Sequence, residues 1–284
     1  MGEAAKIRAT ILGCGSSGGV PRPGGADGFG DWGNCDPENP KNRRTRCSLL
    51  FERAHPVHGF DPHHVTTALI DTSPDMREQL LQAGCTHLDG VLFTHAHADQ
   101  SHGIDDLRVM AIASRKRISV WIDDDTAGEL PERFRYCFEQ RKDSPYPAIL
   151  DRHIIPMDGR PAIIDGPAGP LEITPFVQFH GSVNSLGFRC GDIAYSSDVA
   201  DLPAASFDQL RDLDIWIVDA LQEKAHGSHA HLDLTLEWIA KMQPRQGVLT
   251  NLHVTMDYEA VRAKVPPGIM PAYDGMRLVS ELKR

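Results

Sequence analysis

Short apolar runs recur along the chain, and most of them end at a polar or glycine-containing segment. Seven of these runs have the length of a β-strand, at residues 6–12, 65–70, 90–93, 171–179, 193–195, 215–218 and 247–250. A short apolar run bounded by turn residues is typical of a strand buried in a sheet. The pattern therefore predicts buried strands, most of them followed by a loop that can carry functional side chains.

Helical stretches lie between these strands. One begins at Ser73-Pro74-Asp75, where serine can cap the helix and proline fits its first turn, and Gly84 can end it. Residues 232–242 and 258–265 are further helical stretches. Alternating strands and helices predict an α/β architecture. Since there is no repeat or low-complexity linker, a single domain spanning residues 1–284 is expected.

Residues 13–47 break this pattern. The segment holds nine glycines and four prolines, a composition that cannot build regular elements. It ends in the basic stretch at residues 41–46, which reads Lys-Asn-Arg-Arg-Thr-Arg. Because long loops in compact domains are usually functional, we expect this one to fold over a site.

Composition narrows the classes of protein. The chain has 29 lysines and arginines against 39 aspartates and glutamates, so its net charge is −10, and it contains 14 histidines. A protein that coats long nucleic acid needs a basic face, so the charge argues against that class. No apolar run approaches the roughly 20 residues of a membrane span, and the first residues lack the apolar core of a signal peptide. We therefore expect a cytoplasmic protein with reduced cysteines and no membrane partner.

Metal-binding residue types are densest after the run at residues 90–93. The sequence there reads Thr94-His95-Ala96-His97-Ala98-Asp99-Gln100. Two histidines separated by one residue point the same way in an extended chain, so His95 and His97 can bind one ion while Asp99 reaches it from the turn. A solvated histidine-rich loop is the simpler alternative. Because further histidines and aspartates follow later strands, the segment predicts a catalytic site of the zinc type.

The segment resembles the His-x-His-x-Asp-His signature of the metallo-β-lactamase-fold hydrolases, with Gln100 in place of the last histidine. The resemblance implies a four-layer αββα sandwich with two mixed sheets, outer helices and the metal centre at one sheet edge. It implies that Asp71 orients the ligands without touching the metal and that Asp99 belongs to the catalytic set. The metal ligands that it implies are His95, His97, Asp99, His180, Asp198 and His253.

Within that superfamily, the chain most resembles the phosphoribosyl cyclic phosphodiesterase and ribonuclease Z-like subgroup. The likeness rests on the opening at residues 13–21 and on the segments 47–50 and 231–234. In that subgroup, a histidine about 22 residues before the last ligand protonates the leaving group. Counted back from His253, this histidine is His231. His226 and His229 are then expected to be solvated loop residues.

Two positions depart from the subgroup. Gln100 offers an amide instead of an imidazole, and Asn251 stands where a final histidine is common. The second metal is then weakly held or absent, unless His253 or His102 completes its site. The loop also lacks the cysteine cluster that holds the subgroup's structural zinc, so none is expected.

The resemblance implies a metal-dependent phosphodiesterase that hydrolyses a small cyclic phosphate or nucleotide-like ester with metal-activated water. One or two divalent ions, Zn or Mn, are the implied cofactors, and a homodimer is the default assembly. Basic side chains in the loop, at Arg43, Arg44 and Arg46, are candidates for holding the phosphate. Three alternatives stay open: a thioester or lactone hydrolase, ribonuclease Z-like RNA processing, and a degenerate protein that only binds a nucleotide.

Overall fold

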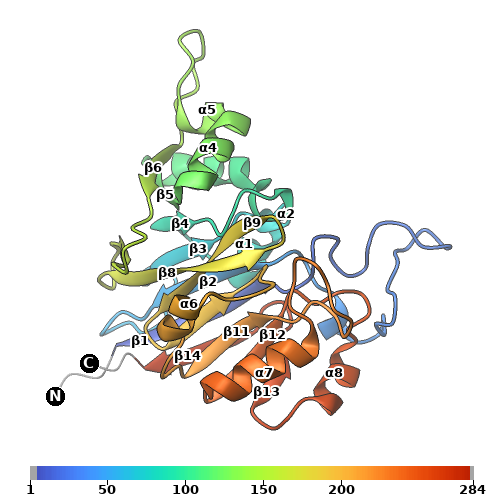
Figure 1. Ribbon diagram of the computed structural model, residues 1–284. Helices are drawn as coiled ribbons and strands as arrows, with labels where there is room; N and C mark the ends of the chain where they lie inside the picture. The colour runs from blue at the N-terminus through green and yellow to red at the C-terminus, as the bar shows by residue number, and fades with distance from the viewer. Residues whose placement is uncertain (1–4, 282–284) are drawn as a thin grey trace.

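Two seven-stranded sheets pack face to face, with helices on both outer sides (Figure 1). The structure, a computed structural model, describes residues 5–281. Across these residues, no helix combines the length and the apolar character that crossing a bilayer requires. The four-layer αββα sandwich expected from the sequence is confirmed.

The first sheet contains both ends of the described chain. Its spatial order is β14 (Arg277–Glu281), β1 (Lys6–Gly13), β2 (Ser48–Arg53), β3 (Thr66–Ile70), β4 (Gly90–Leu92), β5 (Ile118–Ile122) and β6 (Leu150–Ile154). Pairing is antiparallel from β14 to β3 and parallel from β3 to β6. The sheet is therefore mixed, as expected.

The second sheet repeats this plan. Its spatial order is β13 (Ile269–Pro271), β12 (Gln246–Thr250), β11 (Ile215–Asp219), β10 (Ile193–Ser196), β9 (Val183–Cys190), β8 (Leu171–His180) and β7 (Ala162–Ile164). Strands β10 to β13 are parallel, and β7 to β10 are antiparallel. In each sheet, the parallel strands direct their carboxyl ends to one edge.

The helices divide between the two outer faces. On the first sheet lie α1 (Met76–Ala83), α2 (Ala98–Ser101), α3 (Leu107–Ser114), α4 (Asp124–Arg133) and α5 (Arg135–Phe138). On the second lie α6 (Ala204–Gln209), α7 (Leu232–Met242) and α8 (Tyr258–Lys264). Two short 3-10 helices, η1 (Pro40–Asn42) and η2 (Ile104–Asp106), lie in connections.

Alternation along the strands produces these layers. In β2, Leu49 and Phe51 pack between the sheets, whereas Leu50 packs under the helices of the first sheet. In β11, Ile217 faces the inter-sheet core and Trp216 faces the helices of the second sheet. Because successive side chains point to opposite faces of a strand, strands that are apolar at every position serve two cores at once.

A buried carboxylate joins the two ends of the glycine-rich loop. Asp274 accepts hydrogen bonds from the backbone N–H of Cys14 (3.1 Å) and from the backbone N–H and hydroxyl of Thr45 (both 2.7 Å). Between these ends, the loop packs on the segment after β12, where Asn42 donates to Asp257 at 2.6 Å. Burial raises the pKa of Asp274 to about 6, although the bonds from Thr45 and Cys14 oppose the rise.

This raised pKa predicts a pH-dependent contribution to stability. A carboxyl whose folded-state pKa lies above its unfolded value stabilises the fold most at low pH, and that contribution is lost as pH rises through about 6. The free energy of unfolding of the wild type should therefore fall, relative to Asp274→Asn, by about 2 kcal/mol between pH 4.5 and 7.5. Urea unfolding of both proteins at the two pH values measures this difference. Equal pH dependence in the two proteins would contradict it.

Candidate metal centre

Polar residues gather where the parallel strands of both sheets end. Asp71 follows β3, Asp198 follows β10 closely, and Asn251 follows β12. All three residues adopt the left-handed backbone conformation, with φ angles of 63°, 49° and 59°. Aspartate and asparagine are among the few residues other than glycine that adopt this conformation, which turns the chain sharply. Such strained positions are typical of functional sites.

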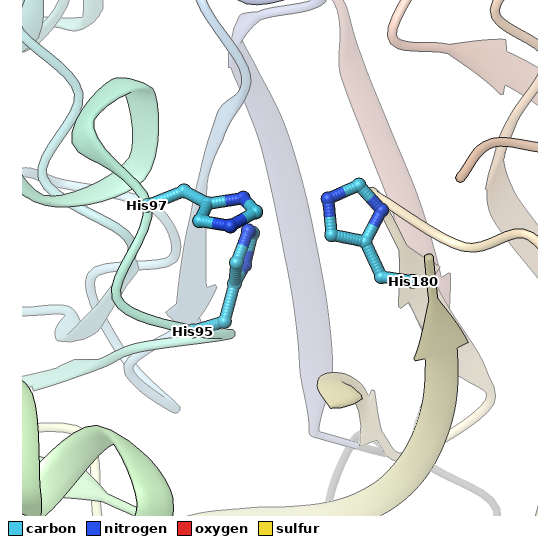
Figure 2. Close-up of side chains that lie close together, drawn as sticks. All are labelled: His95, His97 and His180. Carbon is cyan, nitrogen blue, oxygen red and sulfur yellow. The ribbon is translucent and has the colours of Figure 1, made fainter. Parts of the chain in front are cut away.

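Three imidazoles face one another at this edge (Figure 2). His95 and His97 come from the turn after β4, and His180 ends β8. Their ligand atoms all lie within 4.8 Å of one another. The ring centroids are separated by 4.4 Å, 5.1 Å and 5.2 Å, with His95 and His180 buried and His97 exposed. The structure thus brings together three of the predicted metal ligands from segments more than 80 residues apart.

A chain of hydrogen bonds fixes the proton on His95. The hydroxyl of Thr94 donates to Asp71 Oδ2 (2.8 Å), so its oxygen accepts from Nδ1–H of His95 (2.9 Å). The backbone N–H of Thr94 donates to the other oxygen of Asp71 at 2.8 Å. Asp71 therefore orients the first imidazole through Thr94, which leaves the lone pair of that imidazole on Nε2.

The free nitrogen of His95 fits a metal ion. His95 Nε2 is buried and has no hydrogen-bond partner within residues 5–281. Burial lowers the pKa of His95 well below its usual value, and the neighbouring His180 and His97 lower it further, so the ring is neutral. His180 donates from Nδ1 to the carbonyl of Ser228 (2.6 Å), which leaves its Nε2 free as well. Neutral imidazoles with unoccupied nitrogens are the ligands that a catalytic zinc-type ion requires.

A second group shares His180. The ligand atoms of His180, Asp198 and His229 also lie within 4.8 Å of one another. The side-chain N–H of Gln100 donates to Asp198 Oδ2 (2.9 Å). The buried amide oxygen of Gln100 has no hydrogen-bond partner among the described residues. Burial raises the pKa of Asp198, and burial and then the charge of Asp198 raise that of Asp99. Asp99, which is also a predicted metal ligand, interacts with the charges of these groups but is a member of neither.

His229 forms a pair with a second buried aspartate. Its Nδ1–H donates to Asp219 Oδ2 at 2.7 Å, and its Nε2 lies 4.0 Å from Asp198 Oδ1. Burial lowers the pKa of His229, but the hydrogen bond to Asp219 and the charges of Asp219 and Asp198 outweigh burial and raise it to about 9. The imidazole of His229 is therefore protonated on both nitrogens, and positively charged, at neutral pH.

The structure brings His229, and not His231, next to His180 and Asp198. His231 caps the start of α7 and is in neither metal-binding group of the described chain. The expectation that His229 is a solvated loop residue is wrong, since its side chain is only 14% exposed. A spacing of 22 residues separates His229 from Asn251 just as it separates His231 from His253, and the side chains of His229 and Asn251 lie side by side at the site. The sequence spacing is therefore the same for both pairs, and it does not distinguish them.

His253 also lies apart from the two groups. Its Nδ1 bonds to the hydroxyl of Thr255 (3.0 Å), and burial and the charge of Arg22 lower its pKa. Asn251 occupies the site instead, where its amide donates to Asp219 at 3.4 Å. The proposed ligand role of His253 is therefore corrected, because the left-handed turn at Asn251 places position 251 toward the site.

Two of the three candidate phosphate-binding arginines are committed elsewhere. Arg44 is buried in the loop and donates to Asn42 at 3.1 Å, so it cannot reach a substrate. Arg46 forms an ion pair with Asp75 (2.7 Å). Arg43 is exposed and lies over the ring of Trp32, 5.1 Å from its centroid. The structure thus leaves Arg43 alone of the three without a buried contact or carboxylate partner in the described chain.

Comparisons with known proteins extend this description. The octanoyltransferase of Porphyromonas gingivalis (strain ATCC BAA-308 / W83) is 30% identical over 286 residues, which cover 98% of this chain and 52% of that protein. The chain thus spans about half the length of this curated relative. A crystal structure of a new diphosphatase from the PhnP family is 30% identical, with a TM-score of 0.82 and 98% of both chains covered.

More distant structures share the fold alone. The short form of human tRNase Z is 14% identical, with a TM-score of 0.61 over 98% of this chain and 100% of that one. A family model described as the beta-lactamase superfamily domain matches residues 66–251, which include Asp71, the imidazole cluster, His229 and Asn251. Because that match covers most of the chain and the four-layer fold agrees with it, the protein belongs to the beta-lactamase superfamily.

Proposed function

We propose that this chain is a metal-dependent phosphodiesterase that hydrolyses a small cyclic phosphate or nucleotide-like ester. One observation carries the proposal: three clustered imidazoles lie next to a histidine that a buried aspartate keeps protonated. The first group can hold a divalent ion, Zn or Mn, and the second can supply a proton. Hydrolysis of a phosphodiester needs both functions, since the departing alkoxide must be protonated.

The residues of the first group have defined tasks. His95, His97 and His180 would hold the ion, and Asp198 can contribute to a second position through the group it forms with His180. When bound, a divalent ion supplies Lewis-acid chemistry, polarising the phosphoryl group and acidifying water. Asp71 and Thr94 keep His95 in the tautomer that leaves Nε2 free for this purpose.

His229 would act as the general acid. Asp219 holds Nδ1–H, so the second proton is on Nε2, the atom directed toward Asp198 and the shared site. Transfer of this proton to the leaving oxygen leaves a neutral imidazole that Asp219 keeps in place. The proposal therefore moves the acid role from His231 to His229.

The comparisons favour phosphate esters over other substrates. The PhnP-family diphosphatase is similar along nearly the whole chain, whereas the similarity to tRNase Z concerns the fold alone. The net charge of −10 disfavours a long RNA substrate and fits a small one. The octanoyltransferase relative supports one alternative, acyl-ester chemistry, although its name belongs to a protein of which this chain matches about half.

Hydrolysis of bis(p-nitrophenyl) phosphate by the protein loaded with Mn²⁺ or Zn²⁺ tests the function, with p-nitrophenyl octanoate as the acyl substrate. We expect turnover of the phosphodiester to exceed that of the octanoate. His95→Ala and His180→Ala should each lose bound metal, measured by plasma mass spectrometry, together with turnover. His63→Ala, in an exposed loop, is the matched control. Absence of phosphodiester turnover in the metal-loaded wild type would refute the proposal.

The pH profile tests the acid role of His229. Because its raised pKa is about 9, the protonated form persists below that pH and is lost as pH rises through it, so kcat should fall above about pH 9. Removing the charge with Asp219→Asn should move this fall to lower pH. His229→Ala should reduce kcat about 10²–10⁴-fold, as expected for loss of a general acid. If kcat fell by this factor in His231→Ala and stayed unchanged in His229→Ala, the general acid would be His231.

Gln100 controls occupancy of a second metal in this proposal. Its side-chain amide donates to Asp198 Oδ2, and a second ion would need that oxygen as a ligand. Gln100→His replaces that donor with an imidazole ligand, so the number of metal ions bound per chain should rise toward two. Gln82→His adds an imidazole on an exposed face of α1 and controls for adventitious binding. Unchanged stoichiometry in Gln100→His would show that another residue already completes the second site.

A further inference from the structure

A cavity of about 590 Å³ opens beside the imidazole cluster. Its floor is the turn from His95 to His97, one wall is α4, and the other is the tip of the β8–β9 hairpin. This volume lies within the range of cavities that bind small molecules. A substrate whose phosphate lies at the imidazoles would extend into this cavity, so the walls determine which organic group it accepts.

The α4 wall presents a charged stripe. Asp125, Glu129 and Arg133 are spaced four residues apart and therefore share one face of the helix. Arg133 donates to the carbonyl of Ala96 (2.6 Å) and forms an ion pair with Glu129. The carboxylate of Asp125 has no hydrogen bond or ion pair with any residue between 5 and 281, and it is exposed. This wall is thus fixed to the metal-binding turn and offers a free acceptor with negative charge.

The hairpin wall presents an aromatic ring beside an amide. Phe179 and Asn184 lie directly opposite each other in the antiparallel pair of β8 and β9, so their side chains share one face. Phe179 is 44% exposed although it is apolar, and both residues line the cavity. The Asn184 side chain is exposed and makes no hydrogen bond within the described part of the chain. An exposed aromatic face in a cavity is suited to stacking on a planar ring.

We propose that this cavity binds the nucleoside part of a nucleotide-like phosphodiester. The base stacks on Phe179, the sugar hydroxyls donate to Asp125, and Asn184 bonds to the polar edge of the base or sugar. The negative charge of the α4 wall disfavours a phosphate there, so the phosphate lies at the imidazole end and the nucleoside at the far end. The inference rests on the proposed phosphodiesterase function and specifies its substrate class.

A comparison of kcat/KM for two substrates tests this assignment. The p-nitrophenyl ester of thymidine 5′-phosphate carries a nucleoside, and bis(p-nitrophenyl) phosphate does not. Asp125→Asn and Phe179→Leu should each lower the ratio of kcat/KM for the first substrate to that for the second by about tenfold. Asp124→Asn is the matched control, because Asp124 precedes Asp125 in the first turn of the same helix but does not line the cavity. Ratios that stay at the Asp124→Asn value in both variants overturn the proposal.

A binding measurement separates the cavity from the chemistry. Calorimetry on the Mn²⁺-loaded protein should give AMP a lower Kd than 2′,3′-dideoxy-AMP by about tenfold in the wild type, and equal values in Asp125→Asn. AMP that binds no tighter than inorganic phosphate, or an undiminished preference for AMP in Asp125→Asn, overturns the nucleoside assignment. If bis(p-nitrophenyl) phosphate is not hydrolysed while the AMP preference holds, the phosphodiesterase function fails and the nucleoside site stands.

Discussion

Face-to-face burial of two mixed sheets is the constraint on which the site depends. Apolar side chains of both sheets, such as Phe51 and Ile217, fill one core between them. That packing fixes the relative position of the two sheet edges where the parallel strands end. The candidate metal-binding residues come from both edges, with His95 after β4 of the first sheet and Asp198 after β10 of the second. A site assembled from two sheets can be held to ångström precision only because the core between them is close-packed.

Buried polar groups at this edge are costly to desolvate, and hydrogen bonds within the site offset much of that cost. Both oxygens of Asp71 accept from Thr94, and Asp219 Oδ2 accepts from His229 and Asn251, whereas Asp219 Oδ1 has no partner in the described chain. The unpartnered Nε2 of His95 is informative, because a buried nitrogen without a partner among other imidazoles would be destabilising unless an ion occupies the centre. Gln100 stands where the signature has a histidine ligand, and its amide forms a hydrogen bond to Asp198 in place of a bond to a metal.

The two carboxylate–histidine systems have opposite electrostatic effects. For His95, the aspartate acts through a hydroxyl, burial is the dominant effect on the pKa, and the ring stays neutral. For His229, Asp219 bonds directly to the ring, and its charge outweighs burial. A neutral imidazole and a protonated one therefore occur in the same site, because a hydroxyl lies between the aspartate and the ring of His95 but not between Asp219 and the ring of His229. Environment, not residue type, assigns their roles.

The sequence by itself determined the sandwich and picked out His95, His97, His180 and Asp198, which the structure brings together in two groups able to hold an ion. All seven apolar runs are strands, because a run of apolar side chains is favoured where a strand packs in the core, and the motif around His95 is local. The strands without such a run mix polar and apolar positions, as in β9, or lie at sheet edges, as β7 and β13 do. Only the tertiary structure showed that His229 and Asn251, rather than His231 and His253, lie beside the imidazole cluster. Those choices depend on left-handed turns and on helix start positions, where a shift of two residues redirects a side chain and leaves the sequence pattern unchanged.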